Sequence, residues 1–375
     1  MPKNVEKHRI NFDFYIFAIS VGLALFGLLM IYSASSYTAE LRFGDAFYYV
    51  KKQATAFIAG VPLCVLCAFI PLDKLKKFSG IILGVSIVLL ALVFIPGFGV
   101  ESYGATRWIN LGFFTIQPSE FSKFGLVIFI AAYMSGREMN TFVKTLPPVL
   151  AGGVVCLLIM FEPNMSVTVC VAAVTALMLF FGGIRGKHAA GYALPVFAAV
   201  PALIIAEPYR IKRITAFLDP WSSPKGEGYQ LIQSFYALAS GGLFGVGIGN
   251  SRQKYLFLPF AESDFILSVI CEETGLFGCL IVVAAFVFLI TRGIICAVRA
   301  KDRFACYLGA GISVMFGVQT IVNIAVVSGA IPPTGLPMPF ISAGGTSLIA
   351  YMCAAGLLVN VSRNGNHTQN FLKPT

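Results

Sequence analysis

The sequence predicts an all-α polytopic membrane protein with about ten transmembrane helices, on the basis of three observations. Its 375 residues are 57% hydrophobic and only 12% charged, with a mean hydropathy of +0.82, which lies outside the range of soluble domains. Apolar runs near 20 residues recur along the chain, and each could cross ~30 Å of hydrocarbon. The runs are continuous, whereas membrane β-barrel strands alternate over ~10 residues.

The predicted spans follow one another through the whole chain and form a single domain, residues 1–375. They are residues 13–36, 52–71, 78–96, 119–136, 146–161, 164–183, 188–206, 264–291, 304–328 and 342–361. Outside them we expect a cytoplasmic N-terminus (1–12), a long extracellular loop (207–262) between the seventh and eighth spans, and a cytoplasmic C-terminal tail (362–375).

The distribution of Lys and Arg predicts the orientation. Ten spans place both termini on one side, where sixteen Lys and Arg fall, against four on the other side when the long loop is set aside. The positive-inside rule then places both termini in the cytoplasm. The net charge of +10 is accounted for by this inner-leaflet bias, so we expect no nucleic-acid partner.

A conspicuous acid, Asp264, stands where the long loop meets the eighth span. On this topology it faces outward at the membrane boundary, where it could act on a lipid-linked substrate. Asp is also a common helix N-cap, so capping of a helix that starts at Ser263 or Asp264 is an alternative interpretation. Glu272 and Glu273 follow, and Asp264, Ser268 and Glu272 fall on one helical stripe. Continuing the helix would carry the two glutamates ~12 Å deeper into the membrane, where they would pair with Lys123 or hold the bundle together.

The loop before the fourth predicted span carries a second group of polar residues. Pro118 and Ser119 predict a helix start with Ser119 as the N-cap. Glu120 and Lys123 are three residues apart and therefore share a helix face. A lysine inside a membrane span is a functional candidate, although an internal ion pair or a side chain that reaches outward to water is an alternative.

Two outward segments have distinctive composition. In the long loop, residues 230–243 have the spacing of an amphipathic helix on the membrane surface, and the glycine-dense stretch Ser240–Asn250 fits tight turns better than a phosphate loop, which needs a preceding strand. In the last outward segment, four prolines between residues 332 and 339 prevent a regular helix. We expect a re-entrant loop there that closes one side of an outward-opening cavity.

The cysteines and histidines indicate no metal centre. Cys64 and Cys67 lie within a predicted span and are interpreted as packing residues. His8, His188 and His367 are scattered along the predicted cytoplasmic edges.

Taken in order, these blocks resemble the SEDS family (shape, elongation, division and sporulation), whose members include FtsW, RodA and SpoVE. The matching blocks are Gly104–Gly112, Gln117–Lys123, Asp219-Pro220, Gly228-Tyr229-Gln230, Ser240–Gly249, Leu258–Glu273 and Thr334–Ser347, so the resemblance covers nearly the whole chain. One departure is that Glu162-Pro163-Asn164-Met165-Ser166 replaces a Pro-Asp-x-Gly-Thr-like motif. The amide at Asn164 is given no catalytic role, and the difference favours an FtsW- or SpoVE-like member over a RodA-like one.

The resemblance implies a peptidoglycan glycosyltransferase of the bacterial cytoplasmic membrane that polymerises lipid II for cell division, cell shape or sporulation. It implies Asp264 as the catalytic base, Arg107 and Lys123 as stabilisers of the leaving diphosphate, and Glu120 as the residue that orients Lys123. Loop arginines or a divalent cation, Mg²⁺ or Mn²⁺, are further candidates for that stabilisation. The partners implied are a class B penicillin-binding transpeptidase, lipid II with the growing glycan strand, and other divisome or elongasome membrane proteins.

Further residues in the matching blocks are candidates for substrate binding. They are Arg107, Trp108, Gln117, Ser119, Gln230, Ser240, Gly241, Pro339, Ser342, Gly344, Gly345 and Ser347. Two other functions remain open on the residues: a transporter that flips lipid II, and a non-catalytic scaffold that positions the transpeptidase.

Overall fold

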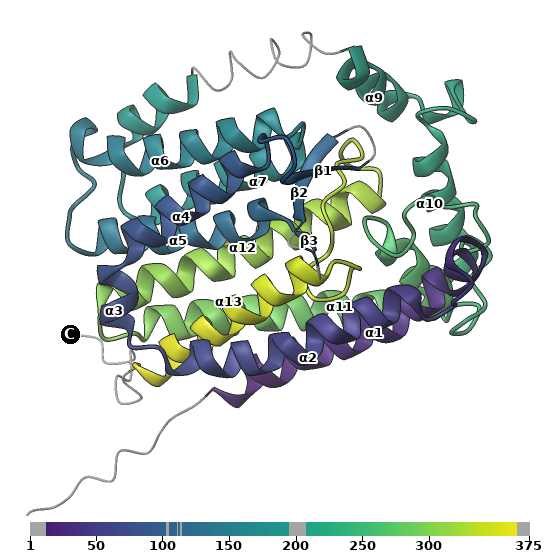
Figure 1. The fold of residues 1–375 in the computed structure, drawn as a ribbon, viewed down its shortest axis with the longest axis horizontal. Coiled ribbons are helices and arrows are strands. Elements are labelled where there is room, and N and C mark those ends of the chain that lie inside the picture. Colours follow the sequence, from purple (N-terminus) through teal and green to yellow (C-terminus); the bar gives the residue numbers. More distant parts are fainter. Residues whose placement is uncertain (1–12, 103–104, 111, 113–114, 195–207, 366–375) are drawn as a thin grey trace, which may run out of the picture.

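A computed structural model describes residues 13–102, 105–110, 112, 115–194 and 208–365. The chain forms a bundle of long helices (Figure 1). Within the described residues, six helices are long and apolar enough to cross a membrane, and α4 and α7 are shorter apolar helices. The outer surface exposes large apolar side chains, such as Phe180 and Ile281 at 71% and 70%, as expected where lipid and not water is the solvent.

The described helices are α1 (Phe14–Phe43), α2 (Tyr48–Phe69), α3 (Leu72–Lys77), α4 (Ser79–Leu92), α5 (Pro118–Ser135), α6 (Phe142–Phe161), α7 (Met165–Phe181), α9 (Pro208–Leu218), the short 3₁₀ helix η1 (Pro220–Ser222), α10 (Tyr229–Gly241), α11 (Ile266–Val298), α12 (Arg303–Val327) and α13 (Gly345–Arg363). Nine of the ten predicted spans coincide with helices in this described part. The seventh, 188–206, is helical over 188–194, and the rest lies outside the described residues.

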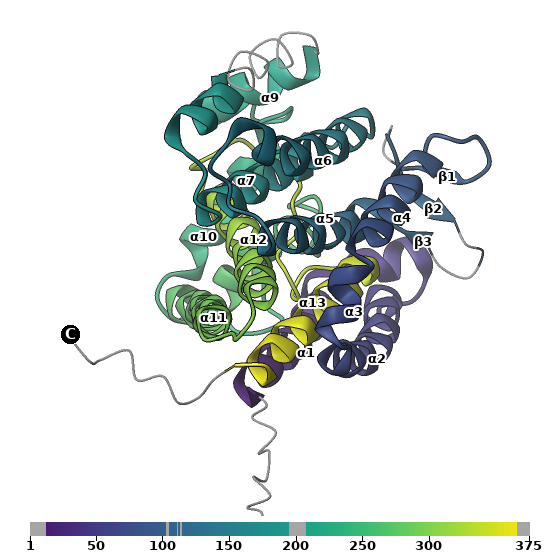
Figure 2. The same cartoon turned by 90° about the vertical axis from the view of Figure 1, so that its left-hand side faces the viewer.

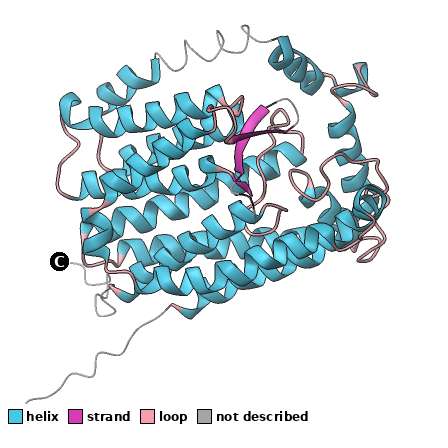
Figure 3. Ribbon diagram, viewed as in Figure 1, coloured by secondary structure: helices cyan, strands magenta, loops and turns pink. Residues whose placement is uncertain are grey.

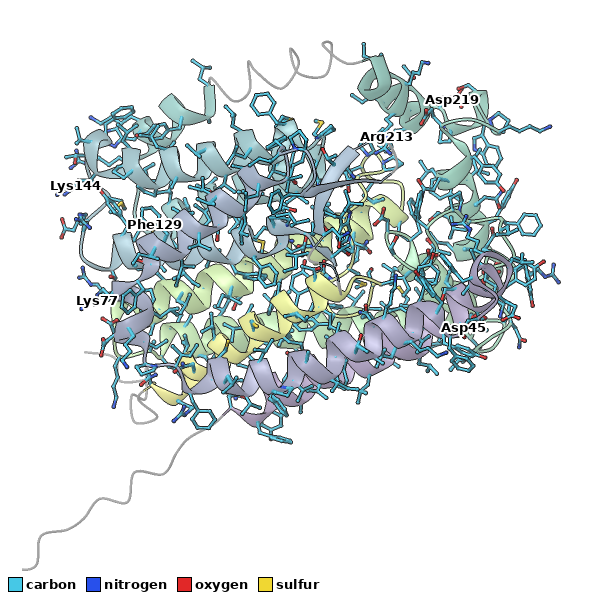
Figure 4. All side chains as sticks on the ribbon, in the orientation of Figure 1. Asp45, Lys77, Phe129, Lys144, Arg213 and Asp219 are labelled. Carbon is cyan, nitrogen blue, oxygen red and sulfur yellow. The ribbon has the colours of Figure 1, made fainter. Side chains whose placement is uncertain are left out.

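Both ends of the described chain lie at one end of the bundle. The Asp13 backbone N–H donates to Ser362 Oγ at 3.2 Å, which joins the start of α1 to the end of α13. Lys77 and Lys144 lie at this same end, whereas Asp45, Arg213 and Asp219 lie at the opposite end (Figure 4). An even number of spans predicts this arrangement of the two chain ends.

The centre of the bundle is formed by α5, α12 and α13, which the other helices surround (Figure 2). The α2–α13 contact is especially close, because a Cβ on Gly356 would collide with the backbone carbonyl of Cys64. Cys64 itself is fully buried in the core. The packing role predicted for this cysteine is therefore confirmed.

The predicted all-α membrane fold is confirmed, and one small part of the described residues forms strands instead of helix. Strands β1 (Gly99–Ser102), β2 (Ala105–Asn110) and β3 (Thr115–Ile116) form an antiparallel sheet in the order β1-β2-β3 (Figure 3). Thr346 Oγ1 donates to the carbonyl of Thr115 at 3.1 Å and so ties this sheet to α13. The strands lie in the loop that precedes the fourth predicted span.

Helix α11 is broken at Gly275, which has φ 69° and ψ −170°. A side chain there would collide with the backbones of Leu243 and Gly245, so only glycine fits. Every residue from Ile266 to Glu273 is buried, whereas burial after the break is periodic, with Val282, Phe286 and Leu289 inward. The first part of α11 is thus enclosed by protein, and the second part has one face toward lipid.

The two parts of α11 run in different directions relative to the membrane. The Asp264 carbonyl accepts a hydrogen bond from Asn323, and Ser234 forms hydrogen bonds with Ser268 and with the carbonyl of Val327. The chain from Asp264 to Ser268 therefore runs alongside α12 from Asn323 toward its outer end at Val327. Beyond the break it returns, and Arg292 pairs with Asp13 at 2.5 Å at the end where the chain termini lie. The expectation that Glu272 and Glu273 lie deeper than Asp264 is therefore wrong.

Candidate functional site

Asp264 lies in the turn that precedes α11 and is half-buried. Helix α11 begins at Ile266, its N-cap is Phe265, and no side chain caps it. The alternative that Asp264 is an N-cap is therefore wrong, because its carboxylate accepts no hydrogen bond from the first backbone N–H groups of α11. The Asp264 backbone carbonyl accepts a hydrogen bond from Asn323 Nδ2 at 2.9 Å.

The segment 332–344 packs beside Asp264 as irregular backbone, as the four prolines predict. From Leu336 onward it is enclosed by protein: Leu336, Met338 and Phe340 are 1–2% exposed, and a Cβ on Gly27 of α1 would lie 2.7 Å from the Ile341 Cα. Burial among helices is the condition under which non-helical backbone is tolerated at membrane depth. We call residues 332–344 the proline loop.

Several hydrogen bonds fix the proline loop against the Asp264 turn. Ser342 Oγ donates to the carbonyl of Ser263 at 2.6 Å, and the Ala343 N–H donates to the carbonyl of Glu262 at 2.9 Å. On the other side, Gly344 N–H donates to Gln53 Oε1 of α2 at 2.9 Å. Ser342 and Gly344, predicted to bind substrate, therefore hold the loop in place in this structure.

Gly335 of the proline loop faces the Asp264 carboxylate. A Cβ built on Gly335 would lie 3.2 Å from Asp264 Oδ2, and Gly335 has φ +68°. It is exposed, unlike the buried residues that follow it in the loop. A side chain at this position would therefore crowd the carboxylate.

The environment of Asp264 raises the pKa of its carboxyl. Burial raises the pKa of its carboxyl to about 6, the negative charge of Glu262 adds to that rise, and the guanidinium groups of Arg213 and Arg107 oppose it. Two cations thus act electrostatically on this carboxylate. A pKa near 6 suits a general base at neutral pH, because the group is mostly ionised yet still takes up a proton readily.

Arg107 extends from β2 to the turn between α6 and α7. Its Nε donates to the carbonyl of Glu162 at 3.0 Å, and its Nη2 donates to the carbonyl of Pro163 at 2.6 Å. The Glu162 carboxyl is fully buried, and burial raises its pKa to about 8, with the charge of Arg107 opposing the rise. Arg107 thus joins the sheet to the divergent Glu162-Pro163-Asn164 motif.

Asn164 caps α7, since its side-chain oxygen accepts from the Val167 N–H at 3.3 Å. Asn and Asp are about equally good N-caps. The amide in this chain therefore fulfils a structural role that an acid could also fulfil.

Glu120 and Lys123 form a fully buried ion pair, 2.9 Å between Nζ and Oε1, with side-chain exposures of 1% and 0%. Lys123 Nζ also donates to Gln319 Oε1 at 3.0 Å and to the Tyr351 hydroxyl at 3.2 Å. These partners come from α5, α12 and α13. The internal ion pair is thus the arrangement observed, and the ammonium is enclosed by protein side chains.

The predicted cap at Ser119 is wrong. The N-cap of α5 is Gln117, and no side chain caps the helix. Ser119 is instead the second residue of the helix and is fully buried. The helix starts two residues earlier than a Ser119 cap implies, because proline is well suited to the first helical position.

Three predicted substrate residues of the long loop contact the first part of α11 or the segment before it. Gln230 Nε2 donates to the carbonyl of Pro259 at 3.1 Å, and Ser240 Oγ donates to Glu272 Oε1 at 3.3 Å. A side chain at Gly241 would collide with the carbonyl of Cys271. The helix predicted over 230–243 is observed as α10, and its buried face packs on α11; a position on the membrane surface stays a prediction.

The glutamates are bound by the glycine-dense stretch and its surroundings. The Arg252 N–H donates to Glu272 Oε1 at 3.0 Å, and Ser33 Oγ of α1 donates to Glu273 Oε1 at 2.6 Å. Val246 and Gly247 donate from their backbones to the carbonyls of the two glutamates at 3.0 Å. The tight-turn interpretation of the glycines is therefore supported over the phosphate loop.

A cavity of about 440 Å³ lies next to Glu272 and the glycine-dense stretch. It is lined by Ser240, Val246, Asn250, Arg252 and Glu272.

The remaining predicted residues lie near the sheet and the start of α13. Trp108 pairs with Val100 in the sheet and is half-buried, as is Gln117. Pro339 and Ser347 are buried, whereas Gly345 approaches α2, where a Cβ on it would lie 3.3 Å from Ala56 Cβ. Among the described residues, no three His, Cys, Asp or Glu side chains gather as a metal-binding group.

Sequence reasoning missed three residues that shape the site, Gln319, Asn323 and Tyr351, and covered Arg213 only as one of the loop arginines. Gln319 and Asn323 are polar residues four apart within a predicted apolar span. That spacing on one helix face, where polar groups are costly, is a signal that could have identified them. Arg213 carries no comparable signal. Its Nη1 donates to the carbonyl of Pro333 at 3.2 Å.

The fold and site define a multi-pass membrane protein with a carboxylate and two guanidinium groups at one end of its bundle. The model of the cell cycle protein family FtsW/RodA/SpoVE matches residues 14–367. Stage V sporulation protein E of Bacillus subtilis is 38% identical over 358 residues, which cover 94% of this chain and 97% of that protein. The probable peptidoglycan glycosyltransferase FtsW of Geobacter sp. (strain M18) is 37% identical over 355 residues, with coverages of 94% and 97%. The chain therefore belongs to the FtsW/RodA/SpoVE family.

Solved structures agree with this assignment. A chain from a peptidoglycan synthase complex, described as coordinating polymerisation and crosslinking, matches with a TM-score of 0.78 at 27% identity, covering 94% of this chain and 98% of that one. The rod shape determining protein RodA of Thermus thermophilus has the same fold, with a TM-score of 0.70 at 24% identity and coverages of 94% and 97%.

Proposed function

We propose that this protein is a peptidoglycan glycosyltransferase that polymerises lipid II at the outer face of the cytoplasmic membrane. The observation that carries the proposal is the Asp264 carboxylate, half-buried and not used as a helix cap, under the influence of Arg107 and Arg213. Relatives of similar length that bear the name peptidoglycan glycosyltransferase support it.

In the proposed reaction, Asp264 accepts the proton of the acceptor's GlcNAc 4-hydroxyl. The hydroxyl oxygen forms a bond to C1 of the donor's MurNAc, and the bond from C1 to undecaprenyl diphosphate breaks. A positioned base of this kind commonly contributes ~10²–10⁴-fold to the rate. The negative charge that develops on the diphosphate would be stabilised by Arg107 and Arg213, because fixed cations act strongly where water is excluded.

Lys123 has a different proposed role from the one expected on the sequence. Its ammonium is fully buried and already has three partners, so we assign it a positioning role instead of contact with the diphosphate. Arg107, Trp108 and Gln117 remain candidates for substrate contact. No step is assigned to Mg²⁺ or Mn²⁺, since Asp264 has no second and third acidic, His or Cys side chain grouped with it among the described residues.

The proposed partner is a class B penicillin-binding transpeptidase, which would crosslink the glycan as it is made. The similarity to a chain of a synthase complex that coordinates polymerisation with crosslinking supports this pairing. Other membrane proteins of division, elongation or sporulation are further proposed partners. Both chain termini would face the cytoplasm.

The test is polymerisation of purified lipid II by the purified protein, with and without a co-purified transpeptidase. Wild type should make glycan strands, Asp264→Asn should make none, and Asp219→Asn, which alters an exposed acid of the long loop, should match wild type. Transfer of lipid II across a vesicle membrane without glycan synthesis would favour a flippase. Normal growth of cells that carry only Asp264→Asn would favour a non-catalytic scaffold.

A further inference from the structure

We propose that two side-chain amides of α12, Asn323 and Gln319, are positioning residues that set the gap between Asp264 and the proline loop. The inference rests on the proposed function and deepens it, because it names residues that act through Asp264 without contacting the substrate. Both lie inside a membrane-spanning helix, are 1% and 0% exposed respectively, and are four residues apart, so they lie on one face in successive turns.

Asn323 joins the Asp264 turn to the proline loop through a single amide group. Its Nδ2 donates to the carbonyl of Asp264 at 2.9 Å and to the carbonyl of Leu336 at 2.8 Å. Both amide hydrogens are thus used, one on each segment. The separation of the two backbones at this point is fixed by the reach of one planar group.

Gln319 extends the same connection one helical turn away. Its Nε2 donates to the carbonyl of Pro337 at 3.0 Å, and its Oε1 accepts from Lys123 at 3.0 Å. Lys123 is held by Glu120. The buried ion pair of α5 therefore fixes the orientation of the Gln319 amide, which in turn holds the loop.

The position of these bonds within the loop indicates what they control. Leu336 and Pro337 directly follow Gly335, the residue that faces the Asp264 carboxylate. The far end of the loop is tied separately, by Ser342 to Ser263 and by Ala343 to Glu262. Loss of the Asn323 amide would remove the link between Leu336 and the Asp264 turn, whereas Pro333, Thr334 and Pro337 would keep their bonds to Arg213, Ser166 and Gln319. The Gly335 side of the gap would therefore loosen, and the far end of the loop would stay attached. If position 323 only packed helices together, an apolar residue would serve there, because a buried polar group is costly in a membrane.

A cross-linking experiment tests this without any assay of glycan synthesis. The test uses the double variant Asp264→Cys with Gly335→Cys. The sulfur of Asp264→Cys would lie approximately where Cγ is now, 4.0 Å from a Cβ at position 335. The two sulfurs should therefore form a disulfide after a modest shift of the backbone. We expect the initial rate of oxidation in membranes to fall at least ~5-fold when Asn323→Leu is added. The matched control is Thr320→Val, which removes a hydroxyl that is 3% exposed and has no hydrogen-bond partner among the described residues; it should leave the rate unchanged. Equal rates in the Asn323→Leu and Thr320→Val backgrounds would overturn the proposal.

Kinetics on lipid II provide the second readout. In the otherwise wild-type protein, Asn323→Leu and Gln319→Met should each lower kcat by ~10–100-fold, since small displacements of reacting groups cost factors of this size, and should change KM by less than about 3-fold. Thr320→Val should keep both constants. A kcat near that of wild type in both amide variants would refute the inference. If wild type itself makes no glycan, the proposed function fails, and the cross-linking rates alone decide whether the amides set the gap. Gln319→Met also serves if Asn323→Leu does not accumulate.

Discussion

The Asp264 carboxylate and Gly335 face each other across the outer site, with 3.2 Å between Asp264 Oδ2 and the place where a Cβ on residue 335 would lie. A residue with φ +68° is best filled by glycine, because other residues pay about 1–2 kcal/mol in the left-handed region. Glycine at position 335 thus satisfies two demands, the backbone conformation and the open space in front of the carboxylate.

Gly335→Ala should therefore reduce glycan synthesis by about 10-fold or more, because the methyl group crowds the carboxylate and strains the loop. The measurement is kcat/KM for lipid II polymerisation, together with the thermal midpoint of the purified protein. The control for backbone strain is Gly329→Ala, since Gly329 also has a positive φ (+70°) but a Cβ there would meet the Phe235 ring and not Asp264. Equal losses of activity in the two variants would contradict a specific role for the space at Gly335.

The pH dependence of polymerisation should follow Asp264. Its pKa is raised to about 6 by burial and by Glu262, and the base must be ionised, so kcat/KM should fall as the pH drops through about 6 and level off above it. Glu262→Gln removes a negative charge that raises the pKa of Asp264. Its acidic limb should therefore lie at lower pH than that of wild type. A limb that moves to higher pH, or does not move at all, would show that another group controls the profile.

The sequence was sufficient for the parts of the fold that hydrophobicity controls. The spans and the irregular proline loop follow from apolar length and from proline chemistry. The break at Gly275 could not be predicted, because it depends on the close approach of Leu243 and Gly245 from the long loop. Two hydrogen-bond partners of Lys123 could not be predicted either, since Gln319 and Tyr351 belong to helices that are distant from it in the sequence. Tertiary contacts of this kind decide whether a buried cation meets substrate or protein.

The orientation in the membrane can be tested at Lys225, an exposed residue in the segment between η1 and α10. Helix α10 lies at the end of the bundle opposite the chain termini (Figure 1). The Lys225→Cys variant should react with a membrane-impermeant thiol reagent added to intact cells, because the positive-inside rule places this end outside. The matched control is Lys77→Cys, at the other end, which should react only after permeabilisation. The native cysteines are accounted for by labelling wild type in parallel. The reverse pattern would invert the topology and place Asp264 on the cytoplasmic side.

Substitution of Lys123 alone should destabilise the protein strongly, whereas substitution of Glu120 and Lys123 together should restore much of the stability. Lys123→Met leaves the Glu120 carboxylate enclosed without its partner, and removal of one member of a buried pair costs about 3–5 kcal/mol. We therefore expect a large fall in the thermal midpoint of the purified protein. Glu120→Gln combined with Lys123→Met removes both charges and should recover much of that stability, because the cost of the unpaired carboxylate disappears. Activity should not recover with it, since Gln319 would still lack the cation that orients its amide. Recovery of both stability and polymerisation in the double variant would mean that the pair only fills space and plays no part in holding the proline loop.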